Sequence, residues 1–225
     1  MKKTRVFIDG KEGTTGLKIH DRLKYIKDIE LISLNEADRK NINKRKEALN
    51  SCDIAFLCLP DAAAAEAADM IENDNVILID TSTAHRTEPG WTYGFPELGK
   101  EHTEKIINSK RIAVPGCHAS GFIALIYPLI ENNIISERAG LTTFSITGYS
   151  GGGRSCERDK KYGSPRQYAI TQKHKHLKEM ISVTGLNREP VFCPIVADFY
   201  SGMEVTVALF KEDLLNGNTV EDIKS

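Results

Sequence analysis

The chain has 225 residues, of which 40% are apolar and 27% charged, so it can bury the core of one large domain or two modest ones. Its 30 basic residues balance 31 acidic ones, which excludes a global attraction to nucleic acid or to an anionic membrane surface. No apolar run approaches the roughly 20 residues that span a bilayer, and the first residues lack the apolar stretch of a signal peptide. We therefore expect a cytoplasmic protein with a small-molecule partner.

The first half of the chain alternates short apolar runs with helical stretches, which is the pattern of a parallel sheet covered by helices. Strands are expected at residues 5–9, 29–33, 54–59, 76–80 and 111–114. Helices are expected at residues 16–26, 35–50 and 62–71. A polar loop at 80–86 follows the fourth strand, at the carboxyl edge of the sheet, where ligands of such folds bind.

A second domain begins where the texture of the sequence changes. The strand at 111–114 leads through a Pro-Gly pair to Cys117, and an apolar helix is expected at 122–130. From residue 141 onward the chain turns to strands with a glycine cluster. We therefore predict the α/β class, with a nucleotide-binding domain of parallel strands at 1–116 and a second, catalytic α+β domain at 117–225.

The glycine-rich loop after the first strand predicts a phosphate-binding turn. Gly10, Gly13 and Gly16 give the spacing G-x-x-G-x-x-G, with Thr14 and Thr15 at the start of the following helix. Glycines let the backbone turn tightly and approach a phosphate, while the helix start offers N–H groups and partial positive charge to an anion. An ordinary strand-to-helix turn is the plainer alternative, because this spacing alone is weakly specific.

Residues beyond the second strand bear on which dinucleotide would bind. Ser33 with Arg39 and Lys40 is suited to a ribose 2′-phosphate, as in NADP. Glu36 is suited instead to accept a hydrogen bond from the free 2′-hydroxyl of NAD. The residues themselves leave both cofactors open.

Cys117 is the candidate nucleophile. The five cysteines are odd in number and contain no C-x-x-C pair, so we expect free thiols. Cys117 follows Gly116 between a strand and a helix, and a helix start favours the reactive thiolate. A buried apolar role is the usual alternative for a cysteine, and we assign it to the other four.

A nucleophilic cysteine also needs a group that gives and takes protons, and the segment 174–179 supplies candidates. On a helix His176 and Glu179 would share a face, whereas in an extended segment His174 and His176 would point the same way. A solvated basic helix start is the alternative, and no third ligand is spaced to complete a zinc site, so no metal is expected. Arg86 and Arg154 are candidates to bind a carboxylate or phosphate.

In their order along the chain, these motifs resemble the shorter form of the N-acetyl-gamma-glutamyl-phosphate reductase family. The resemblance spans nearly the whole chain and rests on the segments 10–16, 58–60, 80–86, 115–120, 148–154 and 174–179. It implies an N-terminal Rossmann domain, an α+β domain with the substrate site, NADP as cofactor, a place in arginine biosynthesis, and a homodimer or homotetramer.

The resemblance also implies roles for individual residues. Cys117 would attack an acyl phosphate, phosphate would leave, and NADPH would reduce the thioester to a semialdehyde. The active-site histidine maps to His174 or His176, with His174 favoured and Glu179 in support. The remaining assignments place Arg86, Ser150 and Arg154 near the carboxylate or phosphate of the substrate, and Cys58, Pro60 and Ser82 near the nicotinamide.

The chain departs from the family pattern at its end, where members normally continue into further strands and a glycine-rich segment. We expect a fragment, a truncated product or an unusual short member, with weakened NADP binding. Two rival readings stay open: a related semialdehyde dehydrogenase, for example one acting on aspartate semialdehyde, and a non-catalytic nucleotide-binding protein. A redox sensor that uses Cys117 is a third, weaker alternative.

Overall fold

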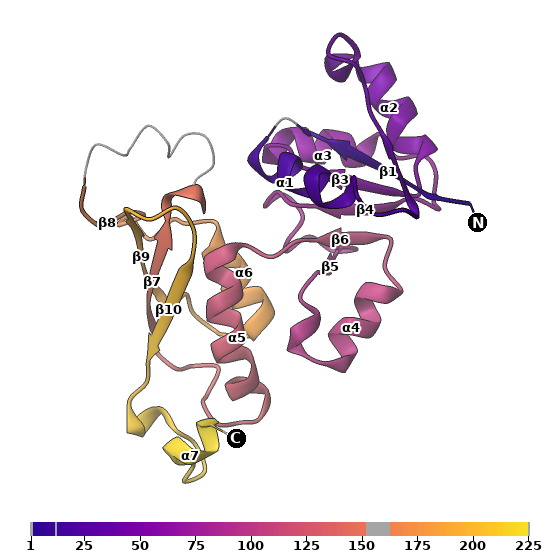
Figure 1. The fold of residues 1–225 in the computed structure, drawn as a ribbon. Coiled ribbons are helices and arrows are strands. Elements are labelled where there is room, and N and C mark those ends of the chain that lie inside the picture. Colours follow the sequence, from indigo (N-terminus) through magenta and orange to yellow (C-terminus); the bar gives the residue numbers. More distant parts are fainter. Residues whose placement is uncertain (1, 12, 152–162, 225) are drawn as a thin grey trace. The chain divides into compact units, whose positions relative to one another are not determined.

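A computed structural model of the chain describes residues 2–11, 13–151 and 163–224 (Figure 1). The chain divides into two compact units, Met1–Val114 and Pro115–Ser225, and each unit has its own sheet. The division proposed from the sequence, after Gly116, lies two residues further along the chain. None of the described helices is long and apolar enough to cross a membrane.

The first unit is built on a sheet of six parallel strands in the order β2-β1-β3-β4-β6-β5. Its strands are β1 (Thr4–Asp9), β2 (Ile29–Ile32), β3 (Ile54–Leu57), β4 (Ile77–Asp80), β5 (Thr92–Tyr93) and β6 (Arg111–Ala113). Its helices are α1 (Thr14–Leu23), α2 (Ile42–Ser51), α3 (Asp61–Asp69) and α4 (Lys100–Ile107), with 3₁₀ turns η1 (Asp38–Lys40) and η2 (Pro96–Leu98). The α/β prediction is confirmed, and each predicted strand ends within two residues of its expected limits.

The order of the strands places a ligand site at the carboxyl ends of β1 and β3. The chain moves from β1 outward to β2 and then returns to the other side of β1 to form β3. In open parallel sheets, ligands bind at the crevice that such a reversal leaves. Behind this edge, a buried cluster that includes Phe7, Leu57 and Leu78 forms the core of the unit.

The predicted helix at 35–50 is wrong in its first part, because two asparagine side chains that bind the backbone divide the segment. The Asn35 side chain accepts from the backbone N–H of Asp38, the first residue of the short turn η1. The Asn41 side chain accepts from the N–H groups of Asn43 and Lys44 and begins α2 at residue 42. An asparagine favours such an N-cap over a place inside a helix. Elements β5, η2 and α4 were not predicted.

The second unit is a mixed four-stranded sheet in the order β10-β7-β9-β8. Its strands are β7 (Thr142–Gly148), β8 (Arg166–Gln167), β9 (Val191–Ala197) and β10 (Met203–Ala208). Its helices are α5 (Cys117–Glu131), α6 (His176–Thr184) and α7 (Val220–Lys224), with the 3₁₀ turn η4 (Lys211–Asp213). Helices α5 and α6 lie against one face of the sheet (Figure 1).

Helix α5 begins at Cys117, five residues before its predicted start. Small residues and Gly121 at 116–121 favour a loop in the sequence, but Gly121 has a packing role inside the helix. A Cβ atom at Gly121 would lie 2.5 Å from Cγ2 of Val205 in β10, so the absent side chain lets the helix approach the sheet. The helix therefore extends over the small residues, and Cys117 occupies its first position.

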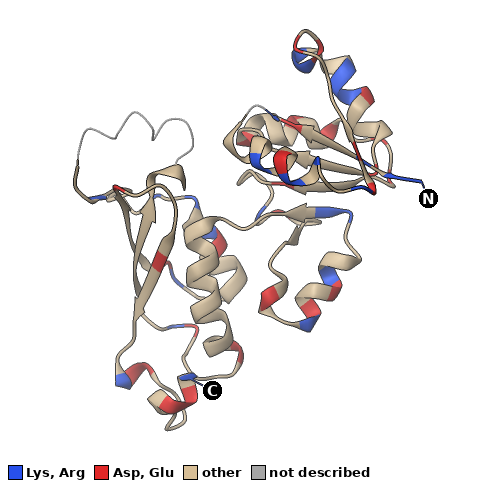
Figure 2. Cartoon of the chain, viewed as in Figure 1, with Lys and Arg blue, Asp and Glu red and all other residues tan. Residues whose placement is uncertain are grey.

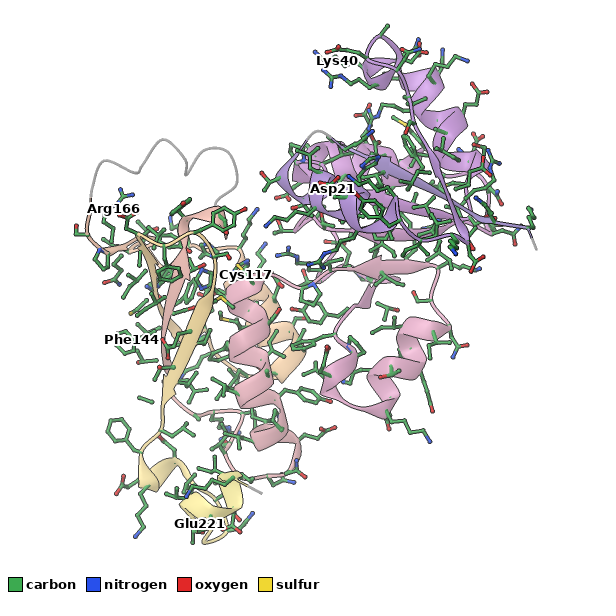
Figure 3. All side chains as sticks on the ribbon, in the orientation of Figure 1. Asp21, Lys40, Cys117, Phe144, Arg166 and Glu221 are labelled. Carbon is green, nitrogen blue, oxygen red and sulfur yellow. The ribbon has the colours of Figure 1, made fainter. Side chains whose placement is uncertain are left out.

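The other face of this sheet exposes several apolar side chains among the described residues, beside Glu204 and Thr206. Phe144 in β7 and Val191 in β9 are 46% and 50% exposed. Figure 3 shows Phe144 on the side of the sheet that faces away from α5. Arg166 and Glu204 are the charged residues of the four strands, in contrast to the charged helix α2 (Figure 2). The face is therefore chemically suited to be covered by another apolar surface.

Candidate active site

The glycine-rich loop of the first unit folds back tightly on the end of β3. Gly10 has φ +83°, and the N–H of Gly13 donates to the Gly10 carbonyl at 3.0 Å. A Cβ atom at Gly10 would lie 2.3 Å from the Cys58 carbonyl oxygen, and one at Gly16 would lie 2.5 Å from the Gly10 oxygen. Both positions therefore exclude any side chain, which explains two of the three glycines.

The start of α1 is suited to bind an anion. Gly13 is the N-cap, Thr14 and Thr15 are the first helical residues, and no side chain caps the helix. The first turn contains no acidic residue, so its N–H groups and its partial positive charge are not neutralised within the helix. This donor set fits the phosphates of a dinucleotide.

The residues predicted to choose between NADP and NAD contact each other. Arg39 donates to the Glu36 carboxylate at 2.9 Å, and both side chains are exposed. Ser33 follows β2 directly and is also exposed. The basic and the acidic candidate thus form one surface ion pair beside the second strand.

Three residues after β3 have different surroundings: Cys58 is half-buried, whereas Pro60 and Asp61 begin helix α3. Burial raises the pKa of the Cys58 thiol to about 11, so this cysteine is protonated at neutral pH. Pro60 is the N-cap of α3, and Asp61 accepts hydrogen bonds from the backbone and hydroxyl of Thr83. The end of β3 is therefore tied to the loop after β4.

A buried carboxylate organises the loop at 80–86. Asp80 accepts from the N–H of Ser82 at 2.8 Å, from its hydroxyl at 2.6 Å, and contacts Nδ1 of His85 at 2.7 Å. The His85 ring stacks on Trp91 with centroids 3.9 Å apart. The Ser82 hydroxyl is thus used inside the loop, which it shapes.

Arg86, at the end of this loop, holds the backbone that leads to the second unit. Its guanidinium donates to the Val114 carbonyl at 2.8 Å and to the Thr81 carbonyl at 3.2 Å. Val114 precedes the Pro-Gly pair that leads to Cys117. By donating to Val114, Arg86 fixes the backbone immediately after β6.

Cys117 begins the second unit's candidate site. It is the first residue of α5, a helix of 15 residues whose N-cap is Gly116 (Figure 3). Its side chain is exposed, whereas the described cysteines Cys52, Cys58 and Cys193 are buried or half-buried. An accessible sulfur at a helix start is the arrangement that favours a nucleophilic thiolate.

Glu179 connects the backbone beside Cys117 to a histidine. Its side chain is buried, and Oε2 accepts from the N–H of Gly116 at 2.9 Å. Oε1 lies 3.9 Å from Nε2 of His176, on the same face of α6 as their spacing predicts. One carboxylate therefore accepts from the start of α5 and lies beside the imidazole of His176.

His174 precedes α6 and is held in one tautomer. Its Nδ1 accepts from the backbone N–H of His176 at 3.2 Å, which leaves the proton of a neutral ring on Nε2. Burial, with a smaller effect of the Lys175 charge, lowers the pKa of His174. Its ring lies 4.5 Å from that of His176 and 5.2 Å from that of Phe192.

Gln172 fixes the backbone that carries His174. Its side-chain amide donates to the Phe192 carbonyl and accepts from the Phe192 N–H, each at 2.8 Å. Gln172 itself has φ +55°, a left-handed conformation that non-glycine residues adopt rarely. Two hydrogen bonds to β9 therefore hold a strained turn immediately before the histidines.

His118 belongs to the same cluster and was not predicted. It is 2% exposed; Nδ1 hydrogen-bonds the Ser145 hydroxyl, and Nε2 lies 2.7 Å from the Tyr168 hydroxyl. Burial, and then the His174 charge, lower the pKa of His118 to about 4. Its ring centroid is 5.8 Å from that of His176. The only local signal was its position next to Cys117, since its partners come from distant segments.

One predicted substrate residue, Ser150, lies two residues after the end of β7. The backbone N–H of Ser150 donates to the Tyr200 carbonyl at 3.0 Å, and Ser150 is half-buried. Arg154 lies outside the described residues. Within the described part of the chain, no three or more His, Cys, Asp or Glu side chains are arranged to hold a metal ion.

Two family models match the chain, one for each unit. A model described as "Semialdehyde dehydrogenase, NAD binding domain" matches residues 4–106. A second, "Semialdehyde dehydrogenase, dimerisation domain", matches residues 117–224. The first unit is therefore a domain for a nicotinamide dinucleotide, in agreement with its glycine-rich loop.

Curated relatives are similar over almost the whole chain. An N-acetyl-gamma-glutamyl-phosphate reductase of Sinorhizobium medicae is 45% identical over 230 residues, covering 98% of this chain and 74% of the relative. One of Trichormus variabilis is 42% identical, covering 99% of this chain and 73% of the relative. The chain thus spans about three quarters of their length.

Solved structures share the fold at low identity. Aspartate semialdehyde dehydrogenase from Francisella tularensis has a TM-score of 0.71 and 13% identity, over 98% of this chain and 79% of that one. The enzyme from Candida albicans, solved with NADP, has a TM-score of 0.67 and 16% identity, over 99% and 75%. At these identities the likeness concerns the fold alone.

Proposed function

The chain belongs to the N-acetyl-gamma-glutamyl-phosphate reductase family, and we propose that it reduces N-acetyl-glutamyl 5-phosphate to N-acetyl-glutamate 5-semialdehyde with NADPH, in the cytoplasm, as a step of arginine biosynthesis. The observation that carries the proposal is the exposed Cys117 thiol at the start of α5, with the buried Glu179 and His176 behind it. Identity of 45% across 98% of the chain supports the choice of substrate over that of the aspartate enzymes.

Cys117 performs the covalent step. Its thiolate attacks the acyl carbon of the substrate, a C–S bond forms, and inorganic phosphate leaves with the electrons of the C–O bond. The partial positive charge at the start of α5 stabilises the thiolate before the attack. When bound, the reduced nicotinamide supplies the hydride that turns the thioester into an aldehyde, and Cys117 is released as the thiolate.

His174 moves the proton. Its Nδ1 accepts from a backbone N–H, so the neutral ring presents a proton on Nε2. The lowered pKa keeps the ring neutral at physiological pH, where it can donate to the oxygen that gains charge. His176 and Glu179 lie behind His174, and Glu179 supports it through the His176 ring.

NADP is the proposed cofactor. Gly10, Gly13 and Gly16 let the loop approach the pyrophosphate, and the N–H groups of Thr14 and Thr15 bind it. Ser33 and Arg39 take the 2′-phosphate, so Arg39 exchanges its exposed partner Glu36 for a phosphate. The proposal places the residues at the sheet edge near the nicotinamide, namely Cys58, Pro60 and Ser82.

The proposal assigns Arg86, Ser150 and Arg154 to the carboxylate or phosphate of the substrate. Arg86 donates to two backbone carbonyls beside the loop at 80–86, and its planar, permanently charged guanidinium suits a carboxylate or phosphate.

A homodimer or homotetramer is the proposed assembly. The apolar face of the second sheet, which includes Phe144 and Val191, is exposed among the described residues, and burying it would be favourable. The matching family model is a dimerisation domain, which supports a contact made by the second unit.

The test is phosphate-dependent reduction of NADP by N-acetyl-glutamate semialdehyde, measured with the purified chain and with Cys117→Ser. We expect the variant to lose at least about a thousandfold in rate, because an alkoxide is far less available than a thiolate at neutral pH. Turnover of aspartate semialdehyde instead would contradict the substrate. A wild-type chain that binds NADP and turns over neither aldehyde would favour the non-catalytic alternative.

A further inference from the structure

Three side chains of the second unit form a hydrogen-bonded chain from the core to the candidate site. Ser145, in β7, is 0% exposed and His118, in α5, is 2% exposed. The His118 ring lies between the Ser145 hydroxyl and the Tyr168 hydroxyl, with Tyr168 half-buried after β8. The Tyr168 ring centroid is 6.0 Å from that of His174, so the chain ends beside the proposed proton-transfer histidine.

Close packing of α5 on the sheet places the first two members together. Val205 of β10 is the direct neighbour of Ser145 across the ladder. Gly121 lies against Val205, and a Cβ atom there would be 2.5 Å from Cγ2. His118 is three residues before Gly121 and so lies on the same face of the helix, above Ser145.

The surroundings of Ser145 decide the direction of the hydrogen bonds. Among the described residues, its hydroxyl has one hydrogen-bond partner, Nδ1 of His118. A buried O–H without an acceptor costs more than a spare lone pair, so Ser145 donates and Nδ1 accepts. A neutral imidazole with a bare Nδ1 carries its proton on Nε2, which therefore donates to the Tyr168 oxygen at 2.7 Å.

The low pKa of His118, about 4, agrees with this assignment, because the ring is neutral at physiological pH and has one proton to place. A phenol that accepts from an imidazole directs its own O–H to another acceptor, and it donates more strongly because hydrogen bonds in a chain polarise one another.

From this geometry we propose that Tyr168 donates a hydrogen bond to the oxygen of the substrate that gains negative charge, and that His118, fixed by Ser145, is its positioning residue. The inference rests on the proposed function. No proton is transferred in this contact: Tyr168 donates a hydrogen bond to the charged oxygen, while His174 remains the group that exchanges a proton.

The first test compares Tyr168→Phe, Ser145→Ala and the double variant by steady-state kinetics. We expect each single variant to lose about tenfold to a hundredfold in kcat/KM, which is at or below the lower end of the roughly 100- to 1,000-fold lost when a donor to a reacting oxygen is removed. The double variant should be no slower than Tyr168→Phe, because both changes act through one contact. Tyr25→Phe is the matched control, since Tyr25 is 79% exposed on the first unit and should keep full activity.

A second measurement reads the tautomer without any activity. Nitrogen-15 NMR of histidine-labelled protein, assigned by difference with His118→Gln, should show the proton of His118 on Nε2. In Ser145→Ala, the signals of both ring nitrogens should move toward an average of the two tautomers.

The outcomes separate this inference from the proposed function. An inactive wild-type enzyme would count against the proposed function. The nitrogen spectrum would still decide the direction of the hydrogen bonds from Ser145 through His118 to Tyr168. A proton found on Nδ1 would overturn the inference, because Tyr168 would then donate to His118. Full activity of Tyr168→Phe in an active wild-type background would overturn it as well.

Discussion

Helix α1 of the first unit and helix α5 of the second begin in nearly the same way. Each follows a strand and a glycine N-cap: Gly13 has φ −75° and ψ 162°, and Gly116 has φ −75° and ψ 145°. No side chain caps either helix by a hydrogen bond, and neither helix has an acidic residue in its first turn. Neither helix therefore neutralises the partial positive charge of its start with a side chain of its own first turn.

The difference lies in what holds each start in place. Before α1, backbone contacts of the described residues hold the loop, with Gly10 packed on the Cys58 carbonyl, and the N–H groups of the first helical turn are left for a phosphate. Before α5, the buried carboxylate of Glu179 in α6 accepts a hydrogen bond from the N–H of Gly116. The first helical residue is Cys117, which carries the thiol. The same backbone device thus serves to bind an anion in one unit and to stabilise a nucleophile in the other.

The strongest way to break the α1 start is Gly10→Ala. The new methyl group would overlap the Cys58 carbonyl and would impose a positive φ on alanine. We expect the free energy of unfolding to fall by roughly 3 kcal/mol and NADPH binding to be lost. Urea denaturation and a fluorescence titration with NADPH measure the two effects.

Gly90→Ala is the matched control for this change. Gly90 has nearly the same φ, +82°, but a Cβ atom there would meet nothing within 4 Å. It should cost only about 1 kcal/mol, the conformational term alone. Equal losses in the two variants would mean that contact with β3 does not shape the loop.

The α5 start is tested by Glu179→Ala and Glu179→Gln. Alanine leaves the buried Gly116 N–H without its acceptor, so unfolding should become easier by about 1–3 kcal/mol. It also removes the support of His176, and we expect kcat to fall about a hundredfold. Glutamine can still accept from Gly116, so it should keep the stability and lose only part of kcat. A stable, fully active alanine variant would contradict the proposed arrangement.

A further effect should appear in the pH dependence of stability. The pKa of His118 falls from its ordinary 6.5 to about 4 on folding. Between these values the unfolded chain binds more protons than the folded one, so the unfolding free energy decreases as pH falls from about 6.5 to 4. The fall from 6.5 to about 4 corresponds to roughly 3.5 kcal/mol, at about 1.4 kcal/mol per pH unit.

His118→Gln isolates this contribution, because the other titrating groups remain. Urea denaturation at several pH values should show a shallower decline in the variant than in the wild type. Parallel curves would mean that His118 is protonated in the folded protein.

The sequence predicted those parts of the fold that local patterns encode. Alternating apolar runs give the parallel sheet, and the glycine spacing gives the loop at Gly10, because both depend on neighbours in the chain. The start of α5 was placed too late because its causes are distant: Glu179 holds Gly116 from 63 residues away, and Gly121 packs on Val205.

The candidate site follows the same rule. Cys117, His176 and Glu179 could be chosen by residue type and helical spacing. His118 could not, because its meaning depends on Ser145 and Tyr168, which tertiary packing brings to it from two other segments. Long-range contacts of this kind leave no periodic signal in a single sequence.

The amide of Gln172 also affects how the sheet meets other chains. Strand β8 pairs with residues 195–196 of β9, and the Tyr168 N–H donates to the Pro194 carbonyl just beyond them. The Gln172 side chain extends this pairing by binding both backbone groups of Phe192. An edge closed in this way offers less template for a foreign strand. The covering of this edge and the placement of His174 therefore share one side chain, so a change at Gln172 should weaken both together.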